Sequence, residues 1–234
     1  MPNYLETVYF TEEYGKDEYP QMLCDYIYER FFEAYAKSHA NTKTKLLDIG
    51  SGKGNHLVAF SRKGVETFGI DKREECVEIL DYFDIRECDI EKDRFPFEDN
   101  SFDFIFSKSV IEHVYNTDNF LNESFRVLKP GGIIVLMTPD WRSHVNYFWD
   151  DYTHVKPFTR KGLQNALKLK NFKEVKCFRF FQLPFVWKYP FLEFVPRVIA
   201  FIPDTFRFRD ADEMRSRVWI RFSKEQMLIA KGVK

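Results

Sequence analysis

Cysteines are few in this chain, and no stretch of it resembles a secretion signal or a membrane-spanning segment. The four cysteines are scattered and none stands in a C-x-x-C pair, so neither a zinc site nor a disulfide framework is indicated. The first 20 residues have no basic stretch followed by an apolar one, unlike a signal peptide. Prolines and charged side chains interrupt the aromatic segment 182–206, whereas a spanning helix needs ~20 nearly uninterrupted apolar residues. We therefore expect a cytoplasmic protein.

The composition is that of a globular protein with an uneven distribution of charge. Hydrophobic residues make up 44% and charged residues 30% of the 234 positions, which excludes a wholly disordered chain. The net charge of −1 hides a split, because residues 1–140 carry 16 basic and 27 acidic side chains, whereas residues 141–234 carry 19 and 9. This is either a chance difference between solvated faces or a sign that the second part meets something anionic, such as a phosphorylated substrate or an acidic lipid surface.

Strand-like and helix-like segments alternate along the chain. An amphipathic helix is predicted over residues 20–37, where apolar side chains recur every four positions from Leu23 to Tyr35. Short apolar runs typical of buried strands follow at 45–49, 65–70, 84–88, 102–107 and 131–138, with helix-like segments at 73–83 and 118–128. This alternation predicts a parallel sheet covered by helices on both faces.

After residue 140 the pattern changes. Residues 141–158 form a loop dense in aromatic and ionisable side chains. Further predicted elements are a helix over 159–170, a strand near 172–181, a helix or strand over 212–222 and a last strand over 225–234. The proline- and aromatic-rich segment 181–217 precedes that last strand. It is interpreted as a lid, a subunit contact or, over residues 181–209, a patch at a membrane surface.

A cluster of glycines follows the first predicted strand. The run Asp48-Ile49-Gly50-Ser51-Gly52-Lys53-Gly54 has an acid at the strand end and glycine at alternate positions. Small residues let the backbone approach a ligand, and the next helix presents free N–H groups to an anionic group. A dinucleotide-binding fingerprint requires glycine at position 55, where Asn55 stands, and the register of a P-loop is absent. The pattern acid-x-G-x-G-x-G remains, and it resembles the class I S-adenosylmethionine-dependent methyltransferases.

The resemblance rests on further motifs over residues 40–140. Asp71 ends the second strand, where the family has an acid that binds the ribose hydroxyls, and a carboxylate suits a vicinal diol because it accepts two hydrogen bonds. Asp89 and Ile90 match the pair of residues that binds adenine in this family. The run FPFEDNSFDFIFSKSVIEHV and its continuation NFLNESFRVLKPGGIIVLMTP resemble the subgroup that methylates quinone rings and other small molecules.

The resemblance implies a Rossmann-like, doubly wound, mostly parallel seven-stranded sheet with helices on both faces and an aromatic-rich insertion before the last strand. It also implies one domain over residues 1–234, with an N-terminal helical cap (1–40), a cofactor-binding core (41–140) and a substrate-side region (141–234). The cofactor-binding residues that it implies are Asp48, Gly50, Ser51, Gly52, Gly54, Asp71, Lys72, Asp89, Ile90 and Ser107. Among these, Gly50 and Gly52 are expected beside the methionine part, Ser107 near the methionyl end, and Asp48 at the amino group.

Methyl transfer from a sulfonium requires an aligned nucleophile and exclusion of water, and it needs no metal. A hydroxyl acceptor also benefits from a general base. His113, in IEHV after the fourth strand, and His154, in WDDYTHVKPFT, are candidates, with Asp151 beside them. The second segment resembles one in some bacterial methyltransferases of glycan assembly. The alternatives are a packing histidine and an ordinary polar loop. Asp151 and His154 provide two metal ligands without a clear third, so no metal is predicted.

The residues after the fourth predicted strand limit which classes of methyl acceptor are expected. They read Ser107-Lys108-Ser109-Val110, not the Asn/Asp-Pro-Pro-aromatic tetrad that holds a flipped base, so nucleic acid is disfavoured. The sequence therefore predicts transfer to an oxygen of a small-molecule or carbohydrate-bearing acceptor, which could be anionic. The alternatives are a non-catalytic cofactor-binding subunit and an RNA or protein methyltransferase.

Overall fold

The computed structural model describes residues 18–73, 83–202 and 219–234, and a seven-stranded sheet runs through them. The strands are β1 Lys45–Ile49, β2 Glu66–Asp71, β3 Asp84–Glu87, β4 Phe102–Lys108, β5 Leu128–Pro139, β6 Lys173–Phe180 and β7 Met227–Val233. Their order is β3-β2-β1-β4-β5-β7-β6. β1 to β5 are parallel, and β7 is antiparallel to both β5 and β6. The predicted doubly wound, mostly parallel sheet is confirmed.

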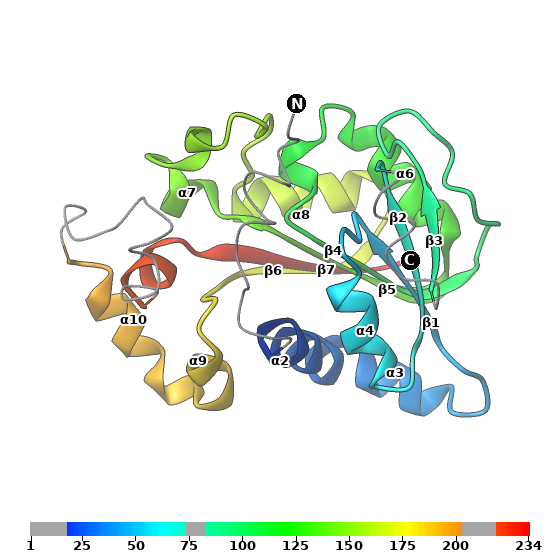
Figure 1. The fold of residues 1–234 in the computed structure, drawn as a ribbon, viewed down its shortest axis with the longest axis horizontal. Helices are drawn as coiled ribbons and strands as arrows, with labels where there is room; N and C mark the ends of the chain where they lie inside the picture. The colour runs from blue at the N-terminus through cyan, green and yellow to red at the C-terminus, as the bar shows by residue number, and fades with distance from the viewer. Residues whose placement is uncertain (1–17, 74–82, 203–218) are drawn as a thin grey trace.

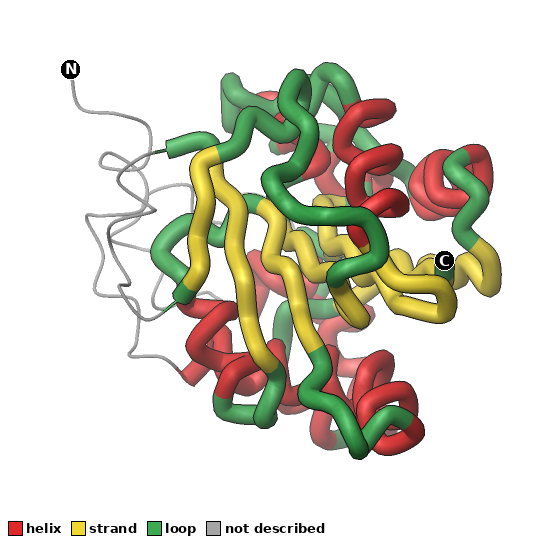
Figure 2. The backbone as a smooth tube through the Cα atoms, turned by 90° about the vertical axis from the view of Figure 1, so that its right-hand side faces the viewer, coloured by secondary structure: helices red, strands yellow, loops and turns green. Residues whose placement is uncertain are grey.

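Helices cover both faces of the sheet, as expected (Figure 1; Figure 2). The helices α2 Glu18–Ile27, α3 Glu33–Ser38 and α4 Asn55–Ser61 lie on one face, and α6 Thr117–Val127 and α8 Arg160–Leu169 lie on the other (Figure 1). The predicted helix over 73–83 falls almost wholly outside the described residues. The two helical layers bury both faces of the central strands.

The apolar run of β4 is continuous because its side chains enter two separate cores. Phe104 and Phe106 belong to the cluster that contains α2 and α4 side chains. Ile105, between them, belongs to the cluster that contains side chains of α6 and α8. Successive strand residues point to opposite faces, so a strand covered on both sides has no polar alternation.

The N-terminal helix differs from the prediction of one regular helix over 20–37. A π-helical stretch, Tyr28–Phe32, separates α2 from α3. Its wider turn puts Phe32 rather than Phe31 in the core, where Phe32 is fully buried and its ring centroid lies 4.4 Å from that of Phe104. Phe31 stacks instead on Phe178 of β6, with 5.9 Å between the centroids.

β5 begins earlier than predicted. Lys129-Pro130-Gly131-Gly132 lies within the bounds of β5, with a bulge opposite the start of β4. Gly131 has φ +79° there, a conformation that favours glycine. The Gly131 N–H donates to the carbonyl of Lys234 over 3.0 Å, which ties the bulge to the C-terminus.

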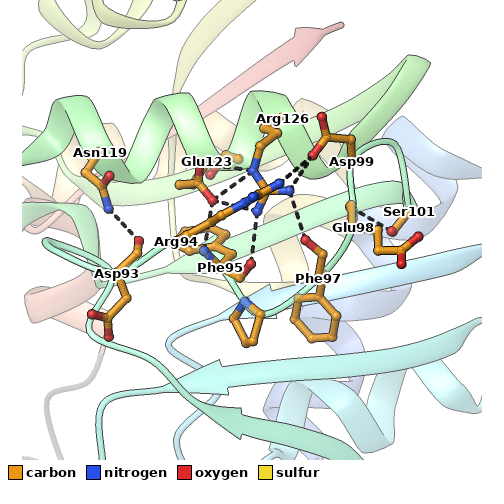
Figure 3. A network of polar contacts seen from close by, with 12 residues as sticks. Asp93, Arg94, Phe95, Phe97, Glu98, Asp99, Ser101, Asn119, Glu123 and Arg126 are labelled. Carbon is orange, nitrogen blue, oxygen red and sulfur yellow. Dashed lines mark hydrogen bonds and ion pairs between the residues drawn. The ribbon is translucent and has the colours of Figure 1, made fainter.

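Arg126 of α6 makes several of the bonds that hold the segment between β3 and β4 to that helix (Figure 3). The Arg126 guanidinium donates to the carbonyl oxygens of Phe95 and Phe97, each over 2.9 Å. It also bonds the carboxylates of Glu123 and Asp99 at 2.6 and 2.7 Å. Five donors in a fixed fork can satisfy several backbone carbonyls of an irregular segment at once. The segment therefore has a defined shape without secondary structure of its own.

The C-terminal part contributes short helices at two places. α7 Trp141–His144 and the 3-10 turn Phe148–Asp150 lie in the region predicted as a loop. The insertion before β7 contains α9 Pro184–Lys188, the 3-10 turn Pro190–Glu193 and α10 Phe194–Ile199, on the same side of the sheet as α2 (Figure 1). Residues 219–224 are helical, and the rest of the predicted 212–222 element lies outside the description. No described helix is both long and apolar enough to cross a membrane.

Candidate active site

The glycine loop after β1 is held against the end of β2. Gly50, Gly52 and Gly54 all have positive φ, at +76°, +51° and +73°. Side chains at these positions would be strained, which explains the alternate glycines. The Gly50 N–H donates to the carbonyl of Ile70 over 2.8 Å, and the Gly52 N–H donates to Oδ2 of Asp71 over 2.9 Å. The loop and the acid at the end of β2 therefore form one unit.

Two buried polar side chains at this loop have no hydrogen-bond partner among the described residues. Asp48 is 1% exposed, yet neither carboxylate oxygen is bonded, and the Ser51 hydroxyl is in the same condition. His56 Nδ1 lies 3.6 Å from Asp48 Oδ2, which is too long for a hydrogen bond. Leaving a buried carboxylate unpaired is costly, so this arrangement favours a ligand that brings donors or positive charge.

The acids at the ends of β2 and β3 have cationic neighbours. Arg73 donates from Nε to Asp71 Oδ1 over 3.0 Å. Asp71 is 4% exposed, and its carboxylate also accepts from the Arg73 backbone N–H and from Arg73 Nη2. With the bond from the Gly52 N–H its acceptor sites are filled, so a further donor has to displace the Arg73 guanidinium. Lys72 Nζ lies 3.1 Å from Asp89 Oδ2. Burial, the largest single effect, opposes the charge of Asp89. The hydrogen bonds from Lys72 and the Glu91 N–H, together with the charges of Lys72 and Lys92, nevertheless lower the pKa of that carboxyl.

The remaining predicted cofactor residues adjoin the same unit. The Cys88 N–H donates to the carbonyl of Asp71 over 2.9 Å, which brings Asp89 and Ile90 beside the end of β2. The Ile90 carbonyl accepts from the Asn119 side chain of α6 over 3.0 Å. Ser107, buried in β4, donates to the carbonyl of Ile49 over 2.8 Å. The structure thus brings the predicted cofactor residues together at the carboxyl ends of the parallel strands, where open α/β sheets bind ligands.

A second group of polar side chains joins the 3-10 turn Ile111–His113 to the loop after Asp150. The ring centroids of His113 and His154 lie 4.7 Å apart, although the residues are distant in the sequence. Thr153 Oγ1 donates to Asp151 Oδ1 over 2.6 Å and lies 2.9 Å from His113 Nδ1. All three predicted catalytic residues, His113, Asp151 and His154, therefore meet in one place.

The hydrogen bonds assign the tautomers of both histidines. The Thr153 hydroxyl donates its only proton to Asp151, so its oxygen accepts from His113 Nδ1–H. His154 Nδ1 lies 2.6 Å from the carbonyl oxygen of Phe148, which can only accept. Each imidazole consequently carries a proton on Nδ1. The two rings come from different segments and are held side by side.

Glu112 completes this group, and the sequence analysis missed it. It is 1% exposed, and its carboxylate accepts from Thr138 Oγ1 over 2.9 Å. Burial raises its pKa to about 7. The sequence gives one signal, an acid inside the apolar turn between Ile111 and Val114. Burial, together with the neighbouring His154, lowers the pKa of His113. The imidazole of His113 therefore stays neutral near pH 7.

Glu112, His113 and His154 each offer a potential metal-ligand atom, and these atoms lie within 4.8 Å of one another. Two other ionisable residues of the 141–158 region are not part of this group. His144 Nδ1 is 3.2 Å from the carbonyl oxygen of Asp140, the residue before α7, and Asp150 is exposed.

A family model described as a methyltransferase domain matches residues 17–176 of the chain. The chain is a class I S-adenosylmethionine-dependent methyltransferase. A crystal structure of a SAM dependent methyltransferase from Archaeoglobus fulgidus has the same fold, with a TM-score of 0.59 at 18% identity over 86% of this chain and 92% of that one.

Two curated relatives of this methyltransferase illustrate how far the similarity extends. The uncharacterized protein MJ1123 of Methanocaldococcus jannaschii is 29% identical over 177 residues, which cover 72% of this chain and 81% of MJ1123. The biotin biosynthesis bifunctional protein BioHC of Cellvibrio japonicus is 31% identical over 135 residues, which cover 54% of this chain and 27% of BioHC. The methyltransferase thus corresponds to about a quarter of the BioHC chain.

The cofactor of this methyltransferase is S-adenosylmethionine, and the site fits it. The molecule carries an ammonium group, a sulfonium and a ribose diol. The carboxylate of Asp48 and the hydroxyl of Ser51, which have no hydrogen-bond partner among the described residues, can accept hydrogen bonds from the ammonium group. The carboxylate of Asp71, fixed by the loop, can accept from a diol that replaces the Arg73 guanidinium. The fit rests on these three side chains and on the close backbone of the glycine loop.

Proposed function

We propose that this methyltransferase transfers the methyl group of S-adenosylmethionine to a hydroxyl oxygen of a small-molecule or carbohydrate-bearing acceptor. The observation that carries the proposal is the pair of neighbouring imidazoles, His113 and His154, whose Nδ1 atoms are both held by hydrogen bonds. A hydroxyl must lose its proton on methylation, and a neutral imidazole is suited to accept it at neutral pH.

We assign cofactor binding to the ten residues predicted from the sequence. The glycine loop would hold the methionyl part, with Asp48 beside the ammonium group and Asp71 at the ribose hydroxyls. Asp89 and Ile90 would contact adenine, supported by their attachments to Lys72 and Asn119. When bound, S-adenosylmethionine supplies an electrophilic methyl group, so the chain has only to orient the acceptor and exclude water.

We assign proton acceptance to His154, with His113 as its neighbour. The bond to the Phe148 carbonyl keeps the His154 proton on Nδ1, so Nε2 is the atom that takes the acceptor's proton. Asp151 Oδ2 lies 3.8 Å from His154 Nε2. Asp151 also orients His113 through Thr153.

Measuring turnover and cofactor affinity separately in a His154 variant tests the assignment. His154→Gln should lower kcat by about 100-fold or more, the usual contribution of a general base, and leave the calorimetric Kd for S-adenosylhomocysteine within about twofold. The exposed His39, which stacks on Tyr35 of α3, provides the matched control, and His39→Gln should change neither quantity. Unchanged kcat in His154→Gln would remove this residue from the chemistry.

The methyl acceptor can be identified from its methylated product. A screen of glycans, phosphorylated metabolites and quinone-like phenols with labelled S-adenosylmethionine should yield a product heavier by one methylene. The positive excess of residues 141–234 favours anionic acceptors in that screen. If the protein binds S-adenosylhomocysteine but labels nothing in any cell-extract fraction, a non-catalytic cofactor-binding subunit becomes the better account.

A further inference from the structure

Apolar side chains project into solvent along the 3-10 turn and helix that follow α9. The exposed fractions are 74% for Phe191, 60% for Phe194, 64% for Val198 and 88% for Phe201. Their spacing of three, four and three residues places them along one side of a helical segment. Tyr189, 44% exposed, precedes this row. A soluble protein seldom exposes so many large apolar side chains together, and such patches mark contact surfaces.

The helix from which this segment extends, α9, is firmly packed. The ring of Trp187 in α9 stacks on Phe180 with 5.0 Å between centroids and lies 5.7 Å from Tyr26 of α2. Its indole N–H donates to the Phe181 carbonyl over 2.7 Å. In α10 itself Pro196 is buried, whereas the apolar row projects into solvent. The segment is therefore anchored at α9 and amphipathic along α10.

The charges beside the row favour an anionic lipid surface over a protein groove. Lys188 Nζ lies 5.5 Å from the centre of the Tyr189 ring. Arg197 is exposed and bonds Glu193 at 2.8 Å, so the one acid of residues 184–202 is already neutralised. Residues 184–202 thus carry two basic side chains, Lys188 and Arg197, against one acid. Aromatic rings beside basic side chains are typical of interfacial segments, in which the rings enter the headgroup boundary.

We propose that residues 189–201 dock this methyltransferase on the surface of an anionic lipid bilayer, with Phe191, Phe194, Val198 and Phe201 entering the headgroup region. The short helices make this a peripheral contact. The proposal is independent of the identity of the methyl acceptor.

Sedimentation with vesicles tests the proposal on the full chain. The protein should sediment with vesicles of phosphatidylcholine and phosphatidylglycerol and bind much more weakly to phosphatidylcholine alone. Adding salt should weaken the binding, because the attraction between basic side chains and acidic lipid is screened. Absence of sedimentation with both kinds of vesicle would overturn the proposal.

Variants at exposed positions make the test specific. The triple variant Phe191→Ser, Phe194→Ser and Phe201→Ser should weaken partitioning into the acidic vesicles by about 100-fold or more. Leu169→Ser is the matched control, because Leu169 is 80% exposed on α8 over the opposite face, and it should bind like the wild type. Lys188→Glu should weaken binding by about fivefold or more.

Two readouts separate this proposal from its alternatives. The triple variant should retain the wild-type Kd for S-adenosylhomocysteine, so a failure of vesicle binding leaves the proposed function untouched. If the triple variant binds vesicles as the wild type does, the row is not the docking surface. If the wild type is a dimer that the triple variant dissolves, with no vesicle binding by either, the row is a subunit contact and the proposal is wrong.

Discussion

Gly50→Ala measures how tightly the cofactor loop is held. Gly50 has φ +76°, and a left-handed conformation costs a residue with a Cβ roughly 1–2 kcal/mol. A Cβ at this position would also lie 2.4 Å from Val110 Cγ2. Valine has few alternative rotamers, so the neighbour must move, at a cost of about 1–3 kcal/mol. The free energy of unfolding should therefore fall by about 2–5 kcal/mol.

Gly64→Ala is the matched control for this experiment. Gly64 has φ +81°, but its Cβ would meet nothing within 4 Å, so only the conformational cost of about 1–2 kcal/mol applies. Urea unfolding should show the larger loss for Gly50→Ala. In a double-mutant cycle, Val110→Ala should recover about 1–3 kcal/mol of the loss in the Gly50→Ala background. Equal losses at both glycines, with no coupling to Val110, would refute the close packing of the loop.

Three further predictions concern Glu112, Arg126 and metal ions. Because the folded pKa of Glu112 is raised from 4.5 to about 7, the folded state keeps a proton that the unfolded state releases. Its contribution to the free energy of unfolding should fall by about 3 kcal/mol between pH 4.5 and pH 7 and stay constant above pH 7. Urea titrations of Glu112→Gln should not show this decrease, and a pH profile identical to that of the wild type would contradict the prediction. Arg126→Lys cannot serve two carbonyls and two carboxylates at once, so the Kd for S-adenosylhomocysteine should rise by about tenfold, which calorimetry would detect. Dialysis against a chelator should leave kcat unchanged; a loss restored by a divalent cation would reassign Glu112, His113 and His154 as metal ligands.

The sequence predicted the sheet well because its signals are local. Each central strand is a short apolar run that ends in a turn, and residues 45–49 and 102–107 match β1 and most of β4. The turn after β1 requires positive φ at three positions, and glycine stands at each of them. Such features depend on neighbours in the sequence, so one sequence is enough to find them.

The features that were missed depend on contacts between distant segments. The π-helical stretch at Tyr28–Phe32 adjusts the helix to the positions of Phe104 and Phe178. Glu112 becomes notable only when Thr138 and the two histidines surround it. The outward row along α10 is recognisable only once the structure shows that Pro196 is buried and that Phe191, Phe194, Val198 and Phe201 are exposed. Periodicity alone does not identify the partner of an apolar face.

A crystal structure with S-adenosylhomocysteine tests the central claim most directly. We predict that the ribose hydroxyls bond the carboxylate of Asp71, that the amino group reaches Asp48, and that the sulfur faces His113 and His154. A ligand bound elsewhere, or one whose sulfur points away from the two histidines, would contradict the active site described here.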